Sequence, residues 1–416
     1  MDSTTEVTFD PFTIYQAADP YPLYRSLRDD APVHYAEDAD LWVVTRYEDC
    51  LGVLRDPETF SSRLGMRRAF TQTRRQRFDD DAADDPFALM GADDLRILIA
   101  VDPPEHVRLR RLLSRPFTPR EIGLHESWMR PLCEERFAEL LSANAEGTAD
   151  WVRDFTWPFP VLVIGELMGI PASMRNDFKR WSDDLIGIFV GGPDTSPQRM
   201  GSLVEMVAFF GETIARRQSE PADDLVSMLI HKAEADNEPL TADELVLFCV
   251  LLLVAGNETT TNLLSNFAAV LVADPTILGT LRSEPGLIPS AVEEALRYES
   301  PIQAIPRGTT RPIRLGGTQI AEDAVVLAYV GAANRDERHY ESPDTFDVRR
   351  NPADHLGFGS GIHLCLGAPL ARLEAHIALE TLSQQVASIE LTAQPVRTGG
   401  LLLRGASSMP VHIEAS

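Results

Sequence analysis

A cysteine framed by glycines is the part of this sequence best suited to chemistry. Residues 358–367 read FGSGIHLCLG and contain Cys365. An apolar helix face follows, at spacings of four, three and four: Leu366, Leu370, Leu373 and Ile377. Cys365 is therefore expected at a helix N-terminus, where free amides and the helix dipole favour a thiolate. Because glycines let the backbone approach a ligand closely, the segment predicts a thiolate that binds a metal or attacks a substrate.

Other glycine-rich motifs do not fit this segment. A dinucleotide-binding fingerprint that begins at Gly357 would need glycine where Ile362 stands. A nucleophile elbow around Ser360 would need glycine at positions 358 and 362.

A long apolar helix carries the second candidate site. Thr241 and Glu244 have the spacing of a capping box, and the pattern predicts a helix over 242–273, about 48 Å long. Its first half is apolar, so most of its faces should be buried.

A polar run, 256–262, interrupts this helix. It could face solvent or mark a break between two helices, because such residues lower helix propensity. Alternatively, it is a site where Gly256 admits a flat ligand and where Glu258 and Thr259 transfer protons.

The remaining elements suggest a mainly α protein with a small β lobe. Helix-like patterns dominate 104–273, and strand-like segments occur at 41–45, 324–330 and 410–413. Asp102 is expected to cap the helix that follows Pro103 and Pro104. Residues 63–94 are expected to form a long loop, either a solvated insertion or a flap over a ligand.

Composition limits the protein class. The chain has 416 residues, 44% of them hydrophobic, so a packed core is expected. The net charge of −25 argues against binding to nucleic acid or to an anionic membrane. Four scattered cysteines, no signal peptide and no apolar run longer than 245–255 favour a soluble cytoplasmic protein. Without a visible linker or repeat, we expect one domain over 1–416.

The segment 358–367 resembles the haem-binding loop of the cytochrome P450 monooxygenases, FxxGxHxCxG. Further matches in the family's order extend the resemblance over nearly the whole chain. The resemblance implies the cytochrome P450 fold, with haem b between the long central helix and the helix after the cysteine. It also implies dioxygen as co-substrate.

The resemblance assigns cofactor contacts. Cys365 would be the axial ligand of the haem iron, and Phe358 would pack on the cysteine side of the ring. The other expected haem contacts come from four separate segments: His106 and Arg110, Ala255, Arg307, and His363 with Gly367. His106, Arg110, Arg307 and His363 would hold the propionates, for which arginine is well suited.

Two further motifs have implied roles. Glu294 and Arg297 match a structural ExxR motif, with Arg350 as the expected third member and Arg349 as its neighbour. Residues 255–260 look like the oxygen-activation motif. There Thr259 would hold bound dioxygen and its protonating water, and Glu258 would relay protons.

The family's substrate pocket maps onto apolar positions here. They are Leu98 and Ile99, Leu251, Val254 and Ala255, Ile302 and Ala304, and Leu401 with Leu402. A lipophilic small molecule is therefore expected, and hydroxylation is the expected reaction. Arg96 is the one nearby charge, and we expect it to be exposed.

Electrons must come from NAD(P)H through separate proteins, because no redox domain is fused to the chain. Arg108, Arg111 and Arg115 lie in a basic segment of this acidic protein. They would dock an acidic ferredoxin, or simply form a solvated helix face. We expect a monomer. A peroxide-driven peroxygenase and a non-catalytic haem-binding accessory protein are the alternatives. Glu258 and Thr259 argue against both.

Overall fold

The computed structural model describes residues 9–11, 13–14, 17–69, 96–189, 196–235, 239–397 and 402–416. Leu401 and the predicted flap beyond residue 69 lie outside these ranges.

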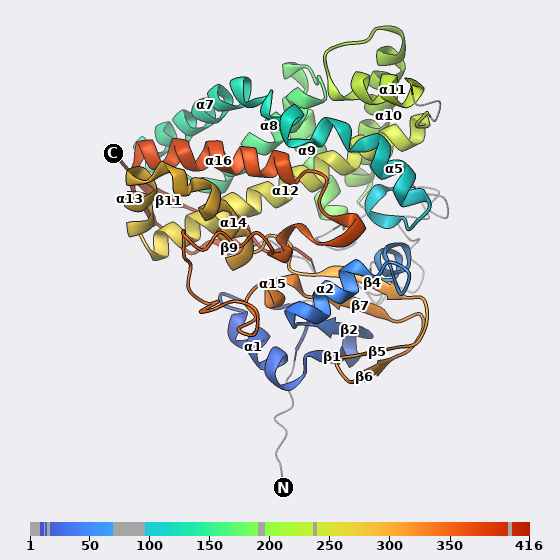
Figure 1. The fold of residues 1–416 in the computed structure, drawn as a ribbon. Helices are drawn as coiled ribbons and strands as arrows, with labels where there is room; N and C mark the ends of the chain where they lie inside the picture. Colours follow the sequence, from blue (N-terminus) through green and yellow to red (C-terminus); the bar gives the residue numbers. More distant parts are fainter. Residues whose placement is uncertain are drawn as a thin grey trace.

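Helices make up most of the described structure, as predicted. Besides a helix over 62–69, the α-helices in chain order are α1 (Tyr21–Asp30), α2 (Tyr47–Arg55), α5 (Glu105–Leu113), α6 (Pro119–Gly123), α7 (Glu126–Ala145), α8 (Pro158–Leu167), α9 (Arg175–Phe189), α10 (Pro197–Ser219), α11 (Leu225–Ala235), α12 (Ala242–Ala273), α13 (Thr276–Ser283), α14 (Ile288–Tyr298), α15 (Val330–Ala333) and α16 (Ala368–Gln385). Figure 1 shows α12 crossing the helical part of the molecule, with α16 beside it and the sheet in a separate lobe with α1 and α2.

The largest sheet has five strands in the order β1-β2-β7-β4-β3. Its strands are β1 (Val33–Ala36), β2 (Leu41–Val44), β3 (Phe60–Ser61), β4 (Ile305–Thr309) and β7 (Val325–Ala328). The β2–β7 pair is parallel and the others are antiparallel. The two-stranded sheets pair β5 (Ile313–Leu315) with β6 (Thr318–Ile320), β8 (Val386–Leu391) with β11 (Val411–Ala415), and β9 (Val396–Arg397) with β10 (Ala406–Ser408). All three predicted strands are present, although β11 joins a small sheet of its own.

The long helix α12 has the predicted bounds. Its capping box is formed, because the Glu244 amide donates to Thr241 Oγ1 at 3.1 Å and the Thr241 amide donates to the Glu244 carboxylate at 2.9 Å. Among the described helices, α12 alone has the length and apolarity of a membrane span, and it packs against α8, α10 and α16 inside the protein.

The polar run neither breaks α12 nor faces solvent, so both of those readings are wrong. Residues 257 and 258 and residues 260–262 are buried. Neighbouring segments satisfy several of these polar groups: Asn257 donates to Ser182 Oγ at 2.9 Å, and Thr261 donates to the carbonyl of Thr156 at 2.9 Å. Hydrogen bonds of this kind offset the cost of burying polar side chains.

Two local predictions near Asp102 are also wrong. Residues 62–69 form a helix rather than the start of a loop. Pro104, not Asp102, occupies the N-cap position of α5. The Asp102 carboxylate instead accepts hydrogen bonds from the Ser61 hydroxyl and the Ser62 amide, at the start of the 62–69 helix.

Candidate active site

The loop before α16 presents the cysteine. Gly359 and Gly361 both have φ of 71°, a conformation that glycine adopts without strain. A side chain at Gly361 would also meet the carbonyl of Leu54 in α2 at 2.6 Å. The Cys365 amide donates to the Phe358 carbonyl at 2.9 Å, which closes the loop. Cys365 is the exposed cysteine of the four, and the others are buried.

The position of Cys365 just before helix α16 is not sufficient to lower the pKa of its thiol below the ordinary value. Although the residue is exposed, desolvation raises the pKa of the thiol. The amides of Gly367 and Ala368, and the charge of Arg110, oppose this effect without cancelling it. The effect predicted for a helix N-terminus is therefore present but outweighed.

Four basic side chains converge near this loop. The rings of His106 and His363 lie 4.2 Å apart. Burial, and then the charges of Arg307, His106 and Arg110, lower the pKa of His363 to about 3. Burial lowers the pKa of Arg307 to about 10 and also lowers that of Arg110. The structure thus brings together all four predicted propionate contacts, and their positive charges oppose one another.

Among the described residues, few groups compensate this basic cluster. Both ring nitrogens of His106 are buried without a hydrogen-bond partner in the described part of the chain. Arg307 is buried and donates to the carbonyl of Pro306 at 2.8 Å. His363 Nε2 shares a hydrogen bond of 2.9 Å with Ser62, a residue that the sequence did not single out.

The middle of α12 combines an exposed backbone position with a buried acid. Ala255 is exposed although residues 252–253 and 257–258 on either side of it are buried, and Thr259 donates to the Ala255 carbonyl at 2.7 Å. Glu258 is buried and accepts a hydrogen bond of 3.3 Å from Asn262. Burial raises the pKa of Glu258, Asn262 partly offsets this, and nearby Asp183 raises the pKa further.

Gly256 has a different role from the one predicted. A side chain at this position would meet Ile164 Cδ1 of α8 at 2.6 Å. The glycine therefore allows close packing of α12 on α8, rather than close approach of a flat ligand.

Several predicted pocket residues are accessible and others are not. Ile99 is 43% exposed, and Leu251, Val254 and Ile302 are partly buried. Leu98 is buried in the main hydrophobic core.

The prediction for Ala304 is wrong. Ala304 is buried in the core of the β lobe, in the cluster that includes Tyr24 and Tyr329, and Leu402 packs against the same cluster. The segment before β4 has this path because Gln303 binds the Leu402 carbonyl and the Tyr24 hydroxyl. Ile305, missed from the sequence, lies against the cysteine loop instead, 3.5 Å from the place of a side chain at Gly359.

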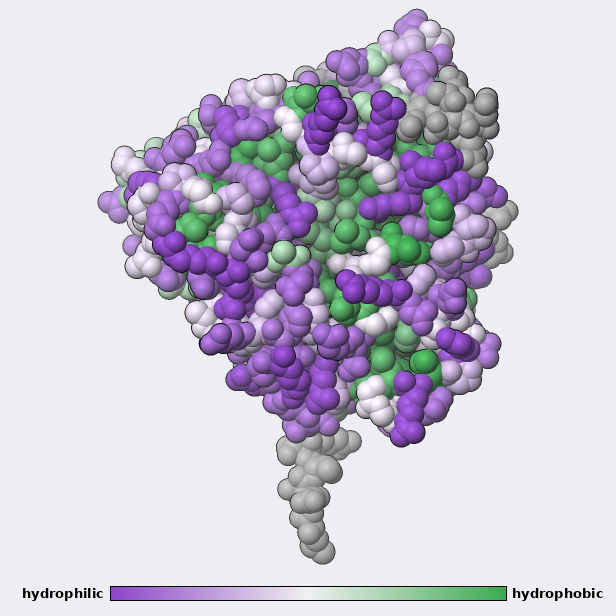
Figure 2. All heavy atoms as spheres, in the orientation of Figure 1, coloured by the Kyte–Doolittle hydropathy of each residue, from purple (hydrophilic) through white to green (hydrophobic). Residues whose placement is uncertain are grey.

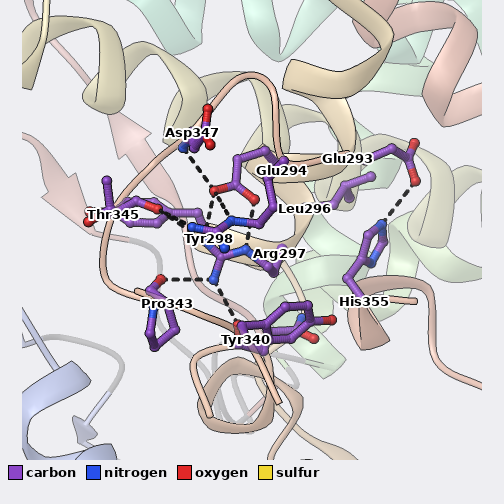
Figure 3. Close-up of polar contacts among 12 residues, drawn as sticks. Glu293, Glu294, Leu296, Arg297, Tyr298, Tyr340, Pro343, Thr345, Asp347 and His355 are labelled. Atoms are coloured by element: carbon purple, nitrogen blue, oxygen red, sulfur yellow. Dashed lines mark hydrogen bonds and ion pairs between the residues drawn. The ribbon is translucent and has the colours of Figure 1, made fainter. Parts of the chain in front are cut away.

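A buried ion pair supports the segment that leads to the cysteine loop (Figure 3). Glu294 and Arg297, both fully buried on α14, form two hydrogen bonds of 2.7 Å. Arg350 Nε donates to the same carboxylate at 3.1 Å. Arg349 instead pairs with Glu284, so the structure selects Arg350 as the third member.

A second ion pair lies under the loop. The Glu293 carboxylate accepts hydrogen bonds from Arg372 at 2.7 and 2.8 Å and from His355 at 3.1 Å. These partners overcome desolvation and lower the pKa of Glu293 to about 2. The Arg372 guanidinium lies 4.6 Å from the centre of the Phe358 ring, which fixes one side of that ring.

Among the predicted docking arginines, Arg108 is already engaged. It pairs with Glu105 at 2.7 Å and with Glu244 of the α12 capping box. Arg111 and Arg115 are exposed. Arg96 is exposed, as expected, and lies 3.6 Å from both Glu105 and Glu244.

A hollow of about 730 Å³ lies elsewhere, beside the C-terminal end of α12. Tyr21, Tyr298, Arg335 and Arg404 are among its lining residues, and none of the predicted site residues is. On the face shown in Figure 2, apolar side chains instead gather around the start of α16.

Comparison with known proteins settles the family. The sequence profile described as Cytochrome P450 matches residues 196–386. The putative cytochrome P450 YjiB of Bacillus subtilis is 38% identical over 371 residues, covering 87% of this chain and 86% of the relative. The chain belongs to the cytochrome P450 family. The 6-deoxyerythronolide B hydroxylase of Saccharopolyspora erythraea is 35% identical over 405 residues, covering 95% and 96% of the two chains.

Solved cytochrome P450 structures share the fold. CYP109Q5 from Chondromyces apiculatus is 34% identical, has a TM-score of 0.84 and covers 98% of this chain and 97% of its own. CYP109E1 from Bacillus megaterium in complex with testosterone is 30% identical, has a TM-score of 0.80 and covers 97% and 99%. The mainly α cytochrome P450 fold is thus confirmed, and the chain is a monooxygenase of this family.

The residues present fit the haem that the family implies. The propionates of haem are two carboxylates. The two unpartnered ring nitrogens of His106, together with the side chains of Arg110 and Arg307, offer donors and positive charge for them. Cys365 is exposed. It lies near this cluster, because the charge of Arg110 acts on its thiol.

Proposed function

We propose that this cytochrome P450 inserts one atom of dioxygen into a lipophilic small molecule, most simply by hydroxylation. The observation that carries the proposal is the buried carboxyl group of Glu258 next to Thr259, in the middle of the enclosed helix α12. Burial of a carboxyl group costs free energy, and a role in proton delivery would account for this cost at Glu258.

We assign the cofactor contacts as follows. Cys365 would bind the iron of haem b, and Phe358, Ala255 and Gly367 would contribute to holding the cofactor. His106, Arg110, Arg307 and His363 hold the propionates. Haem bound to a thiolate supplies the iron chemistry that activates dioxygen. Glu294, Arg297 and Arg350 hold the polypeptide before the cysteine loop in place.

In this proposal, Glu258 and Thr259 deliver the protons that the reaction consumes. Burial raises the pKa of Glu258, so its carboxyl group stays protonated to a higher pH than an exposed glutamate does. That carboxyl group is suited to pass protons, since a general acid works best with a pKa near the working pH. Thr259 Oγ1, which now donates to the Ala255 carbonyl, would re-aim its hydrogen bond toward the reacting oxygen.

A lipophilic substrate class is supported by the apolar character of Ile99, Leu251, Val254 and Ile302. It is also supported by the relatives: one was solved with testosterone and another is named as a hydroxylase of 6-deoxyerythronolide B. NAD(P)H would supply the electrons through a ferredoxin-type protein that docks at Arg111 and Arg115, both exposed.

Two measurements test this proposal. The reduced protein with carbon monoxide should show the red-shifted Soret band of thiolate ligation, and Cys365→Ser should abolish it while Leu364→Ala keeps it. With NADH, a ferredoxin and its reductase, testosterone should gain one atom from labelled dioxygen. Turnover with peroxide but not with NADH would instead indicate a peroxygenase, and a haem protein inactive with both would indicate an accessory role.

A further inference from the structure

Asn262 is a buried side chain on α12 that no step above uses. It lies one helical turn after Glu258 and is fully buried. Its Nδ2 donates to Glu258 Oε1 at 3.3 Å, while its Oδ1 has no partner in the described part of the chain. A buried amide oxygen without a partner is uncommon, because leaving it unpaired costs free energy.

Gly405 leaves room for this amide. A side chain at Gly405 would lie 1.8 Å from Asn262 Oδ1 and 2.2 Å from its Cγ, so the residue must lack one. The backbone of Gly405 has an ordinary φ, and the glycine is therefore explained by space for Asn262 and not by conformation.

The segment that carries Gly405 cannot easily withdraw. Arg404 donates to the carbonyls of Ala17 and Ala18 at 2.8 and 2.9 Å and pairs with Glu299 at 2.5 Å. Asn266, one turn further along α12, donates to the Arg404 carbonyl at 3.1 Å. Asn262 is thus confined between Gly405 and Glu258.

We propose that Asn262 is a positioning residue of the proton relay, whose confined amide holds the Glu258 carboxyl group in both its ionised and its protonated form. The amide nitrogen can donate both to the ionised carboxylate and to the carbonyl oxygen of the neutral acid, while the unpaired Oδ1 lies against Gly405. This inference rests on the proposed role of Glu258. Besides the Asn262 amide, the charge of Asp183 on α9 acts on the Glu258 carboxyl group. Asp183 itself pairs with Lys179 at 3.4 Å.

The test follows the Glu258 carboxyl directly, by infrared titration of the haem-loaded protein. The Glu258 band is the one missing in Glu258→Gln. Asn262→Leu keeps the branched shape and the number of side-chain heavy atoms but has neither donor nor acceptor. It should move the protonated band to higher frequency and raise the titration midpoint. Gly405→Ala should do the same, because it displaces the amide. Asn262→Asp should give a coupled two-step titration.

The relay role has its own readout. With testosterone, NADH and redox partners, Asn262→Leu should release about five-fold more peroxide per NADH than the wild type, as expected for one lost hydrogen bond. Asn144→Leu removes an amide that bonds Ile413 on distant β11, and it should leave this share unchanged.

Two outcomes would overturn the inference: an unchanged Glu258 titration in Asn262→Leu, or a changed titration with an unchanged peroxide share. Failure of the proposed function is distinguishable, because it would appear in the wild type as a missing thiolate band with carbon monoxide.

Discussion

Among single residues, Glu258 shows how burial changes what a side chain can do. The same carboxyl group on the surface would be ionised at neutral pH. In α12 its pKa is raised, mainly by burial and further by Asp183. The protein therefore accepts a loss of stability at the position that we propose for the proton-delivering acid.

Glu258→Gln should separate these two effects. A carboxyl group whose folded-state pKa lies above its ordinary value of 4.5 holds more protons in the folded state. Its contribution to the free energy of unfolding therefore falls as pH rises above about 4.5. We expect the variant to have a higher unfolding temperature than the wild type at about pH 8, an advantage that disappears near pH 4.

The same substitution, Glu258→Gln, should lower the enzymatic activity although it raises the unfolding temperature at about pH 8. Loss of a general acid typically costs roughly 100-fold or more in rate, so NADH-dependent product formation should fall by that order. Glu146→Gln changes an exposed glutamate and is the control for both measurements. Identical stability-against-pH curves for Glu258→Gln and the wild type would contradict the burial argument.

Single residues also show where sequence reasoning stops. The glycine-framed Cys365 and the pair Glu294 and Arg297 were predictable, because local spacing defines them. The contact made by Asp102 was not predictable, because an acid before two prolines can equally well cap another segment. Here Asp102 binds the start of the 62–69 helix. Ala304 was misplaced because the direction of its segment depends on distant Tyr24 and Leu402.

Among the elements, α12 was predicted with the correct bounds because its ends are encoded locally. The capping box at Thr241 fixes the start, and Asp274 before Pro275 fixes the end. The burial of its polar run could not be predicted, since the partners Thr156 and Ser182 come from other helices. Asn262 could have been found, because it lies four residues after Glu258 on one helix face.

Gly256→Ala tests the packing of α12 on α8. The added methyl group would lie 2.6 Å from Ile164 Cδ1, so that side chain must move. We expect a loss of about 1 kcal/mol, the low end for overpacking, because a flexible side-chain end can yield. The measurement is denaturant unfolding. Ile164→Val in the same chain should restore part of the stability.

Gly211→Ala is the matched control on α10, where an added side chain would meet nothing within 4 Å. It should stabilise the protein by up to about 1 kcal/mol, through helix propensity alone. A stabilising effect of Gly256→Ala would show that α8 does not need the glycine.

At the scale of the whole molecule, charge is unevenly distributed. The net charge is −25, yet residues 110–120 contain four arginines and no acidic residue. The arginines are Arg110, Arg111, Arg115 and Arg120, and the next acid is Glu121. Such a positive region on an acidic protein would orient an acidic electron donor. Arg108 pairs with Glu244, and Arg111 and Arg115 are the exposed members of the predicted docking set. The single-domain organisation of 1–416 stays a prediction.

Arg111→Glu and Arg115→Glu should slow reduction by an acidic ferredoxin roughly tenfold at low salt, and the rate should depend less on salt than in the wild type. Stopped-flow reduction at several salt concentrations measures both. Arg314→Glu makes the same change in net charge on β5, where the side chain is exposed, and should leave the rate near that of the wild type. Equal slowing by all three variants would attribute the effect to total charge and not to a docking surface.

The contacts of Arg297 have a consequence for how this protein tolerates sequence drift. Besides Glu294, its guanidinium binds the main-chain carbonyls of Asn334, Pro343 and Thr345 at 2.8 to 3.3 Å. Every amino acid supplies the same carbonyl, so this arginine recognises the path of the chain and is indifferent to its side chains. Positions 343 and 345 should therefore accept many substitutions, while an insertion or deletion between them would shift the carbonyls and should not be tolerated.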